Sequence, residues 1–262
     1  MDLEQFGLTG IQRAVTAAGL TLYSGDVADP DAAWRAARAA HPRTGLWPVL
    51  SYGAEEAAED SHEWAPSAQG PARLAEAAAV PPAEHLRGLI RTQFFYFWSE
   101  GPEHLRTGAD WTPDQVDEYA ERFAAHLSAQ PARPAPQWRR NGDRPEGDTL
   151  LLVPAAAGWQ VPALVPGLLF DWPGGIQKWE LSAVDHAVVL RHWHERYGAE
   201  LYLAHGKYLE LDVARPPRTP DEVVRCAMEQ WTYCNDLGQL MKGLDDVVER
   251  QVPCGHWAFW WD

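Results

Sequence analysis

The alternation of apolar and polar residues predicts strands and helices together, and the most apolar strand lies at the C-terminal end. Residues 256–262 carry four aromatic rings in seven positions. Read as a strand, this stretch sends its side chains to two faces, with Trp257, Phe259 and Trp261 on one and His256, Ala258, Trp260 and Asp262 on the other. Because both faces carry aromatic bulk, we expect a central strand that is covered on both sides.

The remainder of the C-terminal part alternates between strand and helix patterns. We expect strands over 150–154, 160–165, 200–204 and 208–213, and helices over 182–197 and 220–233. The helices begin with capping-box patterns, Ser182 with Asp185 and Thr219 with Glu222, and Gly198 suits the end of the first one. These patterns predict an α+β domain over 149–262 whose mixed or antiparallel sheet is flanked by helices.

The N-terminal part is predicted to be mostly helical. We expect a short helix within 1–19 that ends near Gly19, helices over 30–40, 82–98 and 112–129, a solvated helix or loop over 54–63, and short strands over 20–23 and 45–50. Asp29 is expected to cap the second helix, and Thr112 with Gln115 is expected to form a capping box at the start of the last one. Pro42 is expected to end the second helix. Pro48 is expected to place its strand at an end or an edge of a sheet, because proline cannot donate to the strand ladder.

The stretch 130–148 is rich in proline, glycine and charge, which is typical of a linker. It predicts a division into an N-terminal region 1–129 and a C-terminal domain 149–262. Within the first region, residues 94–98 are apolar on every side of a helix, which predicts burial or a surface covered by a partner.

Charge narrows the classes of partner. The 262 residues include 37 Asp and Glu against 22 Lys and Arg, a net charge of -15 that is spread over both halves. A nucleic acid would be repelled, whereas a basic protein would be steered toward this chain. The alternative is that the negative charge maintains solubility alone. The 14 tryptophans indicate extensive burial before they indicate any function.

Cysteine usage and the absence of apolar runs indicate a soluble cytoplasmic protein. The three cysteines form no CxxC pair and no zinc-type spacing, which favours a reducing compartment. The chain does not start with the basic and apolar segments of a signal peptide. Residues 150–170, the most apolar segment, are interrupted by proline and glycine, so no membrane helix is expected.

Candidate acid/base groups lie in the C-terminal part, but no phosphate loop, nucleophile elbow or metal motif accompanies them. We therefore expect no metal and no cofactor. The candidates are His186, Glu210, Asp212, Glu229, Asp236 and His256, with His205 beside them. The structural alternative treats His186 as a satisfied core histidine and the two strand carboxylates as the wet face of a half-buried strand.

Aromatic residues could form the wall of a site for a sugar or a base. The candidates are Trp193, Trp257 and Trp260, together with the terminal Asp262. His192 and His194 fall on opposite flanks of one helix, which argues against a metal site there. Cys234 is expected at the end of a helix, where the dipole disfavours a thiolate nucleophile.

Several motifs together resemble a bacterial family of unknown function, DUF4253. They are Trp193-His194-Glu195-Arg196-Tyr197-Gly198-Ala199-Glu200, Leu209-Glu210-Leu211, Glu229-Gln230 with Tyr233-Cys234-Asn235-Asp236, and Trp257-Ala258-Phe259-Trp260-Trp261-Asp262. The resemblance covers about residues 150–262, and Gly45-Leu46-Trp47-Pro48 resembles a segment of longer members. It implies no activity, and only an association with accessory or toxin-immunity proteins.

Two functions fit these observations. The first is a non-catalytic module, immunity-like or accessory, that binds a basic protein. The second is an enzyme whose His, Glu and Asp groups converge on a tryptophan-lined pocket against the C-terminal sheet. Convergence of those groups on one cavity would favour the enzyme, and their dispersal would favour the binding module.

Overall fold

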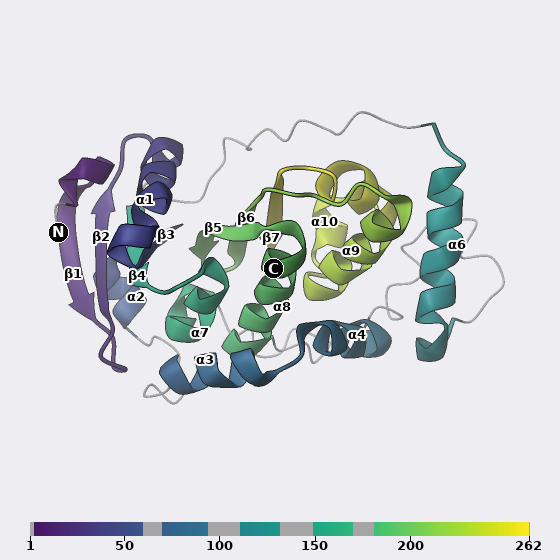
Figure 1. The fold of residues 1–262 in the computed structure, drawn as a ribbon, viewed down its shortest axis with the longest axis horizontal. Helices are drawn as coiled ribbons and strands as arrows, with labels where there is room; N and C mark the ends of the chain where they lie inside the picture. The colour runs from purple at the N-terminus through teal and green to yellow at the C-terminus, as the bar shows by residue number, and fades with distance from the viewer. Residues whose placement is uncertain (1–2, 60–69, 94–110, 132–148, 170–180, 262) are drawn as a thin grey trace. The chain divides into compact units, whose positions relative to one another are not determined.

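A computed structural model describes residues 3–59, 70–93, 111–131, 149–169 and 181–261 (Figure 1). Its contacts divide the chain into two compact units. The first comprises Met1–Val80, Asn141–His194 and Glu200–Leu211, and the second comprises Pro81–Arg140, Glu195–Ala199 and Asp212–Asp262. Strands and helices occur together and the sheet is mixed, so the predicted α+β class is confirmed. The domain boundaries expected at residues 129 and 149 stay a prediction.

The first unit is built on a mixed sheet. Its strands are β1 (Thr9–Val15), β2 (Thr21–Asp26), β3 (Leu46–Leu50), β4 (Thr149–Pro154), β5 (Ala199–His205) and β6 (Tyr208–Val213), in the order β1-β2-β4-β3-β5-β6. The pairs β1–β2, β2–β4 and β3–β4 are antiparallel, and β3 pairs with β5 in parallel. The strand order brings N-terminal strands to both sides of β4, whose residues Leu150–Val153 are buried.

The prediction that Pro48 places β3 at an end or an edge was wrong. Pro48 pairs with Leu152 in the middle of the β3–β4 ladder. Two side chains form hydrogen bonds to β5. The Trp47 indole nitrogen of β3 donates to the Leu201 carbonyl at 3.2 Å, and the hydroxyl of Ser51, the residue that follows β3, donates to the Ala204 carbonyl. Because these side-chain donors bind β5, a proline without an N–H is tolerated inside the sheet.

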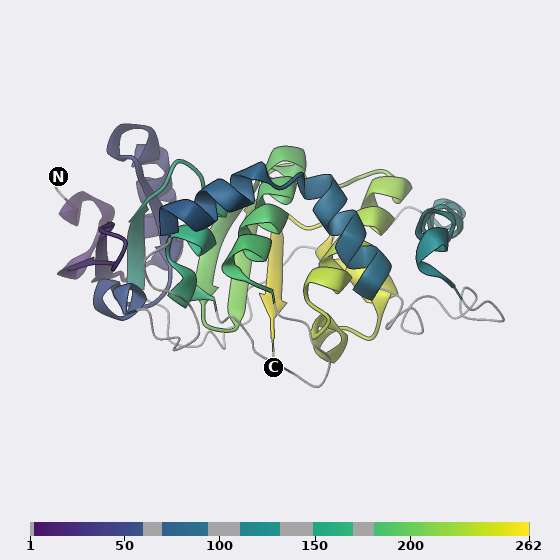
Figure 2. The same ribbon diagram turned by 90° about the horizontal axis from the view of Figure 1, so that it is seen from below.

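Helices cover both faces of this sheet. The helices of this unit are α1 (Pro30–Thr44), α2 (Ala54–Ala58), α3 (Gly70–Ala79), α7 (Val161–Leu164) and α8 (Ala183–Tyr197), of which α3 packs on α7 and α8. Helix α1 packs on the face that carries Leu150 and Leu152. Helix α2 lies on the opposite face (Figure 2), where the Ala54 amide donates to the Ser24 hydroxyl.

Helix α1 begins as predicted, with Asp29 as a side-chain N-cap and Pro30 in the first turn. It does not end at Pro42 but continues to Thr44. Proline disturbs the turn that precedes it, whereas the turn that follows can still close: the Gly45 amide donates to the His41 carbonyl at 2.8 Å. Gly45, at φ 68°, then ends the helix in the left-handed conformation.

Two predicted elements were assigned to the wrong type. The expected helix over 1–19 is a short 3₁₀ helix, Glu4–Phe6, followed by strand β1. The expected strand over 160–165 is the helix α7, preceded by the 3₁₀ helix Gly158–Gln160. Pro162 stands in the first turn of α7, a position that favours helix initiation. All four residues of α7 are buried, so no helical periodicity reveals it.

The second unit is mostly helical. Its elements are α4 (Pro82–Gln93), the 3₁₀ helix Pro113–Gln115, α6 (Val116–Ser128), α9 (Pro220–Tyr233), α10 (Leu237–Leu240), α11 (Leu244–Asp246), a π-helical turn Val247–Gln251 and β7 (His256–Trp260). The predicted capping boxes at Thr112 and Thr219 are both present. Helices α4 and α6 pack against α9. The continuation of the α4 pattern over 94–98 lies outside the described residues.

Strand β7 buries Trp257 and Phe259, as its sequence predicts. Tyr233 of α9 packs edge-on against Phe259 and Trp261, with ring centroids 5.3 Å apart in both pairs. The expectation of a central strand was wrong, because within the described residues β7 is the last strand of the order. The Val213 amide beside it donates to the Gly255 carbonyl at 2.8 Å, and the turn Val247–Gln251 also packs against β7.

Candidate functional site

The predicted acid/base residues are distributed over both units. His186 and Glu210 belong to the first, and Asp212, Glu229, Asp236 and His256 belong to the second. His186 is buried in α8. Burial lowers the pKa of His186 from 6.5 to about 4, against the opposing charge of Asp185. At neutral pH this histidine is therefore uncharged, as a core histidine would be.

The two strand carboxylates follow the alternation of β6. Glu210 is half-buried and Asp212 is exposed, whereas Leu209, Leu211 and Val213 are buried. This pattern is that of a strand with one wet face.

One acid does lie in a buried polar cluster of the second unit. Glu229 is 6% exposed, on α9, close to the Cys226 thiol and the Tyr197 phenol. Burial, followed by the charges of Cys226 and Glu229, raises the pKa of Tyr197 far above its ordinary value. Burial and the charge of Glu229 likewise raise the pKa of Cys226. The phenol and the thiol are thus both held in their protonated forms.

The other two predicted groups of this unit lie on β7 and just before α10. His256 is buried in β7 and alternates with Trp257. The Trp257 ring packs against Tyr197 with centroids 5.6 Å apart, so His256 points to the other face of the strand. Asp236 precedes α10 and accepts a hydrogen bond from Gln239 at 3.1 Å.

The predicted aromatic wall consists largely of core residues. Trp193 and Trp257 are both 0% exposed. The Trp257 indole nitrogen donates to the Val252 carbonyl at 3.2 Å, which fixes the ring in the core. Trp260 is half-buried, and its carbonyl accepts a hydrogen bond from the Cys234 thiol. Asp262 lies outside the described residues.

The cysteines and the possible metal ligands show no reactive arrangement in the described part of the chain. Cys226, Cys234 and Cys254 are free and buried. Burial raises the pKa of all three thiols, so each is protonated at neutral pH. Among the described residues, no group of three or more His, Cys, Asp or Glu side chains could hold a metal ion.

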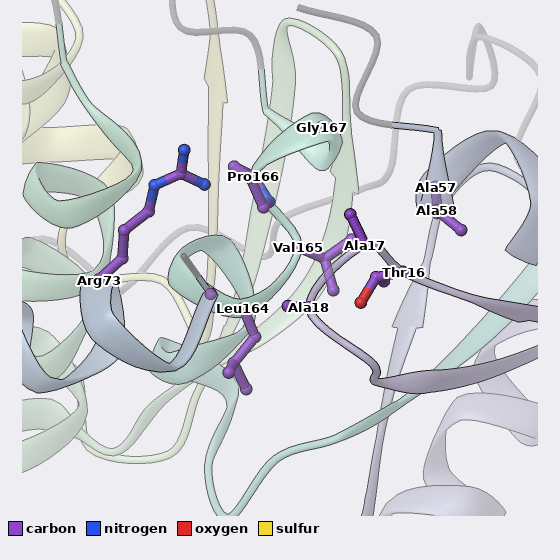
Figure 3. Close-up of a pocket in the computed structure, with 11 residues that line it drawn as sticks. Thr16, Ala17, Ala18, Ala57, Ala58, Arg73, Leu164, Val165, Pro166 and Gly167 are labelled. Carbon is purple, nitrogen blue, oxygen red and sulfur yellow. The ribbon is translucent and has the colours of Figure 1, made fainter. Parts of the chain in front are cut away.

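A small cavity opens beside the turn that joins β1 to β2 (Figure 3). Its walls are mostly apolar and include Ala17, Ala57, Leu164 and Val165, with Arg73 as the charged residue among them. The space open to the centre of a water-sized sphere is about 20 Å³. This is enough for about one water molecule, and far below the several hundred Å³ that ligand pockets of small molecules offer.

The most exposed element of the first unit's sheet is β1, the first strand of the order. Six of its seven residues are exposed and the other, Ala14, is half-buried. Ile11 and Val15, which are 43% and 53% exposed, are the exposed large apolar residues of the described part of the chain. Only β2 pairs with β1 within the described residues (Figure 1). A strand with one open side and exposed apolar residues is a candidate interaction surface.

Charges around β1 are mainly negative. The exposed charged residues of β1 and of its packing neighbours β2 and α2 are Arg13, Asp26, Glu55 and Glu56. No ion pair involves Glu55 or Glu56 within the described residues. Strand β1 therefore carries exposed apolar side chains, and the exposed charges of β2 and α2, which pack against it, are negative.

Sequence reasoning missed this edge because it assigned the segment to a helix. The β-branched residues Thr9, Ile11 and Val15 stand at alternate positions, which is the periodicity of a strand. Gly10, at φ 59°, and the irregular register between Thr9 and Gln12 mark a bulge at its start. The alternation and the glycine were the available indications.

Comparison with known proteins identifies the C-terminal part. Residues 149–262 match the family model described as a domain of unknown function, DUF4253. The resemblance predicted from the motifs is thereby confirmed for that segment, which starts at the first residue of β4. No curated protein and no solved structure matches the chain. No helix among the described residues is long and apolar enough to cross a membrane.

Proposed function

We propose that this chain, which carries a DUF4253 domain over residues 149–262, is a non-catalytic module that binds a basic protein. The observation that carries the proposal is the open strand β1 with its exposed apolar residues and acidic surroundings. Natural sheets usually shield such an edge, because it pairs readily with another chain. An edge that is left open and apolar therefore favours a role in protein binding.

The net charge of -15 supports a basic partner. Opposite charge accelerates the encounter of two proteins and suppresses the binding of acidic competitors. Nucleic acid does not fit, because a polyanion would be repelled. An accessory or immunity-like role is consistent with a module that covers a basic surface. The three free, buried cysteines support a place in the reducing cytoplasm.

The distribution of polar groups supports binding over catalysis. His186, Glu210 and Asp212 fit structural positions, and the thiols are protonated and buried. General acid/base chemistry needs two groups within reach of one substrate, with pKa values close to the working pH. Burial shifts the pKa values of His186, Tyr197, Cys226 and Cys234 in the direction that keeps each of these side chains neutral at pH 7.

Affinity capture with the full chain as bait tests the proposal. The lysate comes from the species that encodes the protein, and each retained protein is then purified and titrated calorimetrically. We expect a basic partner that binds at micromolar Kd or tighter, and more weakly as salt rises. A variant bait with Glu55→Gln and Glu56→Gln lacks the two negative charges of α2 and should bind the same partner more weakly. Retention of only background proteins, or of acidic proteins without salt dependence, would contradict the proposal.

The buried cluster around Glu229 favours a second candidate function, an enzyme with an acid/base pocket. A carboxylate that is only 6% exposed is rare unless it is paired or functional. A thermal-shift screen of sugars and nucleobases tests this alternative. An enzyme should be stabilised by a compound in the wild type and not in Glu229→Gln, whereas a protein-binding module should show no such compound.

A further inference from the structure

We infer that the partner binds by adding an extended segment to β1 as a further strand, with apolar side chains on one face and basic side chains on the other. The inference rests on the proposed function and specifies how and with what the partner binds. Strand addition uses the main-chain groups of an open edge for affinity and the side chains of alternate residues for specificity.

The register of the first hairpin determines which main-chain groups of β1 are available. The Thr16 amide donates to the Leu20 carbonyl at 2.9 Å, so these residues form a hydrogen-bonded pair. In an antiparallel ladder such pairs alternate with pairs that share no hydrogen bond. Val15 opposite Thr21 and Arg13 opposite Tyr23 are therefore of the second kind. Their N–H and C=O groups point away from β2, toward the open side.

Nothing in β1 after its initial bulge prevents pairing. The strand has seven residues and contains no proline and no lysine, which are the usual means of blocking an edge. The bulge lies between Thr9 and Gln12, and the register from Gln12 to Val15 is regular. The two outward-pointing residues thus form a regular stretch on which another strand can align.

The two faces of the sheet select different side chains. Gln12 and Ala14 pair with Ser24 and Leu22, on the face that α2 covers. An added strand would lie beside α2, which packs against β1 and carries the exposed residues Glu55 and Glu56; these charges favour lysine or arginine in the added strand.

The opposite face carries Arg13 and Val15. Val15 is 53% exposed, and an apolar side chain placed beside it would remove both from water. Residues directly opposite or diagonal to Arg13 should not be basic, because like charges across a ladder are destabilising.

A second copy of this chain fits the edge less well than a basic segment. Each copy carries a net charge of -15, so two copies repel each other. Pairing β1 with β1 would also bring two sets of α2 carboxylates together, with Arg13 as the single cation that each strand contributes. The charges around the edge therefore assign it to a basic protein segment.

A phage-displayed library of random dodecapeptides, selected on the full chain, tests the inference. We expect enriched peptides that alternate apolar with Lys or Arg residues, and that slow hydrogen exchange at the Arg13 and Val15 amides. Arg13→Pro removes one outward N–H without touching a bond to β2 and should weaken the selected peptides about tenfold or more. Its matched control, Arg13→Ala, keeps the N–H and should change the affinity less than about threefold. Circular dichroism verifies that both variants fold.

N-methylation of the peptide provides a test that needs no protein variant. Methyl groups on alternate amides that face β1 should abolish binding, whereas methyl groups on the intervening amides should leave it unchanged. Strand addition would be overturned if peptides methylated on the amides that face β1 still bound, or if peptides methylated on the intervening amides did not bind.

The outcomes separate this inference from the proposed function. Peptides that bind elsewhere, or no enriched peptide at all, would overturn strand addition, while a captured basic partner would still support the function. Acidic or neutral peptides that protect Arg13 and Val15 would overturn the basic character of the segment alone. A wild-type dimer in solution that becomes monomeric in Arg13→Pro would assign the edge to a second copy, and would overturn the inference.

Discussion

Replacing Gly158 by alanine should destabilise the protein, because the new methyl group has no room. A Cβ built on Gly158 would lie 2.8 Å from two ring atoms of Trp47 and 2.9 Å from the Leu201 amide nitrogen. The Trp47 ring cannot easily move away. Its indole nitrogen donates to the Leu201 carbonyl at 3.2 Å, and the Arg38 guanidinium lies 4.4 Å from its centre.

The expected magnitude follows from these contacts. Overpacking in a core costs about 1–3 kcal/mol, and a lost or weakened indole hydrogen bond adds about 1 kcal/mol. We therefore expect Gly158→Ala to lower the free energy of unfolding by about 2–4 kcal/mol. For a chain of this size that corresponds to a fall in Tm of roughly 5–12 °C. Urea and thermal unfolding, followed by circular dichroism, provide the measurement.

Two further variants control the interpretation. Gly88→Ala is the same substitution at an exposed position of α4, where a new Cβ would have no other atom within 4 Å. It should stabilise by about 0.5–1 kcal/mol, because alanine is the better helix former. In a Trp47→Phe background the smaller ring leaves space, so Gly158→Ala should cost clearly less there. An unchanged Tm for Gly158→Ala, or an equal cost in both backgrounds, would refute the role assigned to Trp47.

Three further predictions concern protonation, thiol burial and the independence of the C-terminal segment. Because the His186 pKa is about 4 in the folded protein and 6.5 without burial, the unfolded chain takes up the proton first as pH falls. As pH falls from 6.5 to 4, protonation of His186 in the unfolded chain should therefore lower the free energy of unfolding by about 3 kcal/mol. The variant His186→Gln should show a flatter pH profile in urea unfolding. The three buried thiols should not react with Ellman's reagent in the native protein at mildly alkaline pH and should all react in denaturant; rapid reaction of a native thiol would contradict its burial. In a fragment of residues 149–262, β4 lacks both of its neighbouring strands, β2 and β3. We therefore expect this fragment to be insoluble or unfolded, and a cooperative thermal unfolding transition of the fragment would refute the expectation.

The sequence predicted best those elements whose ends are set by local chemistry. The capping boxes at Thr112 and Thr219 located the starts of their helices. Gly198, at φ 62°, ended α8 where a left-handed residue was expected. These features depend on residues that are neighbours in the chain, so the sequence alone contains the necessary information.

Elements that depend on distant partners were harder to predict. Pro48 lies inside the sheet because the side chains of Trp47 and Ser51 bond to β5. Helix α7 is buried on every side, so it has no periodic pattern that separates helix from strand. The aromatic rings of β7 correctly predicted burial, but they did not reveal that packing against α9 would replace a second neighbouring strand.

The candidate site was missed for a related reason. An open edge is a property of strand order, and the order of this sheet joins β1 and β2 to β4 across more than a hundred residues. The chemistry-bearing residues that the sequence identified are spread over both units instead. The acidic balance was visible in the composition, but its placement beside an open strand required the fold.

Hydrogen exchange of the Arg13 and Val15 amides, measured with and without the purified basic partner, tests the central claim most directly. Both amides point away from β2 and have no partner strand in the described part of the chain. Binding by strand addition predicts that both become strongly protected, while the Ala14 amide, already paired with Leu22, changes little. Unchanged exchange at Arg13 and Val15 in the saturated complex would contradict the account.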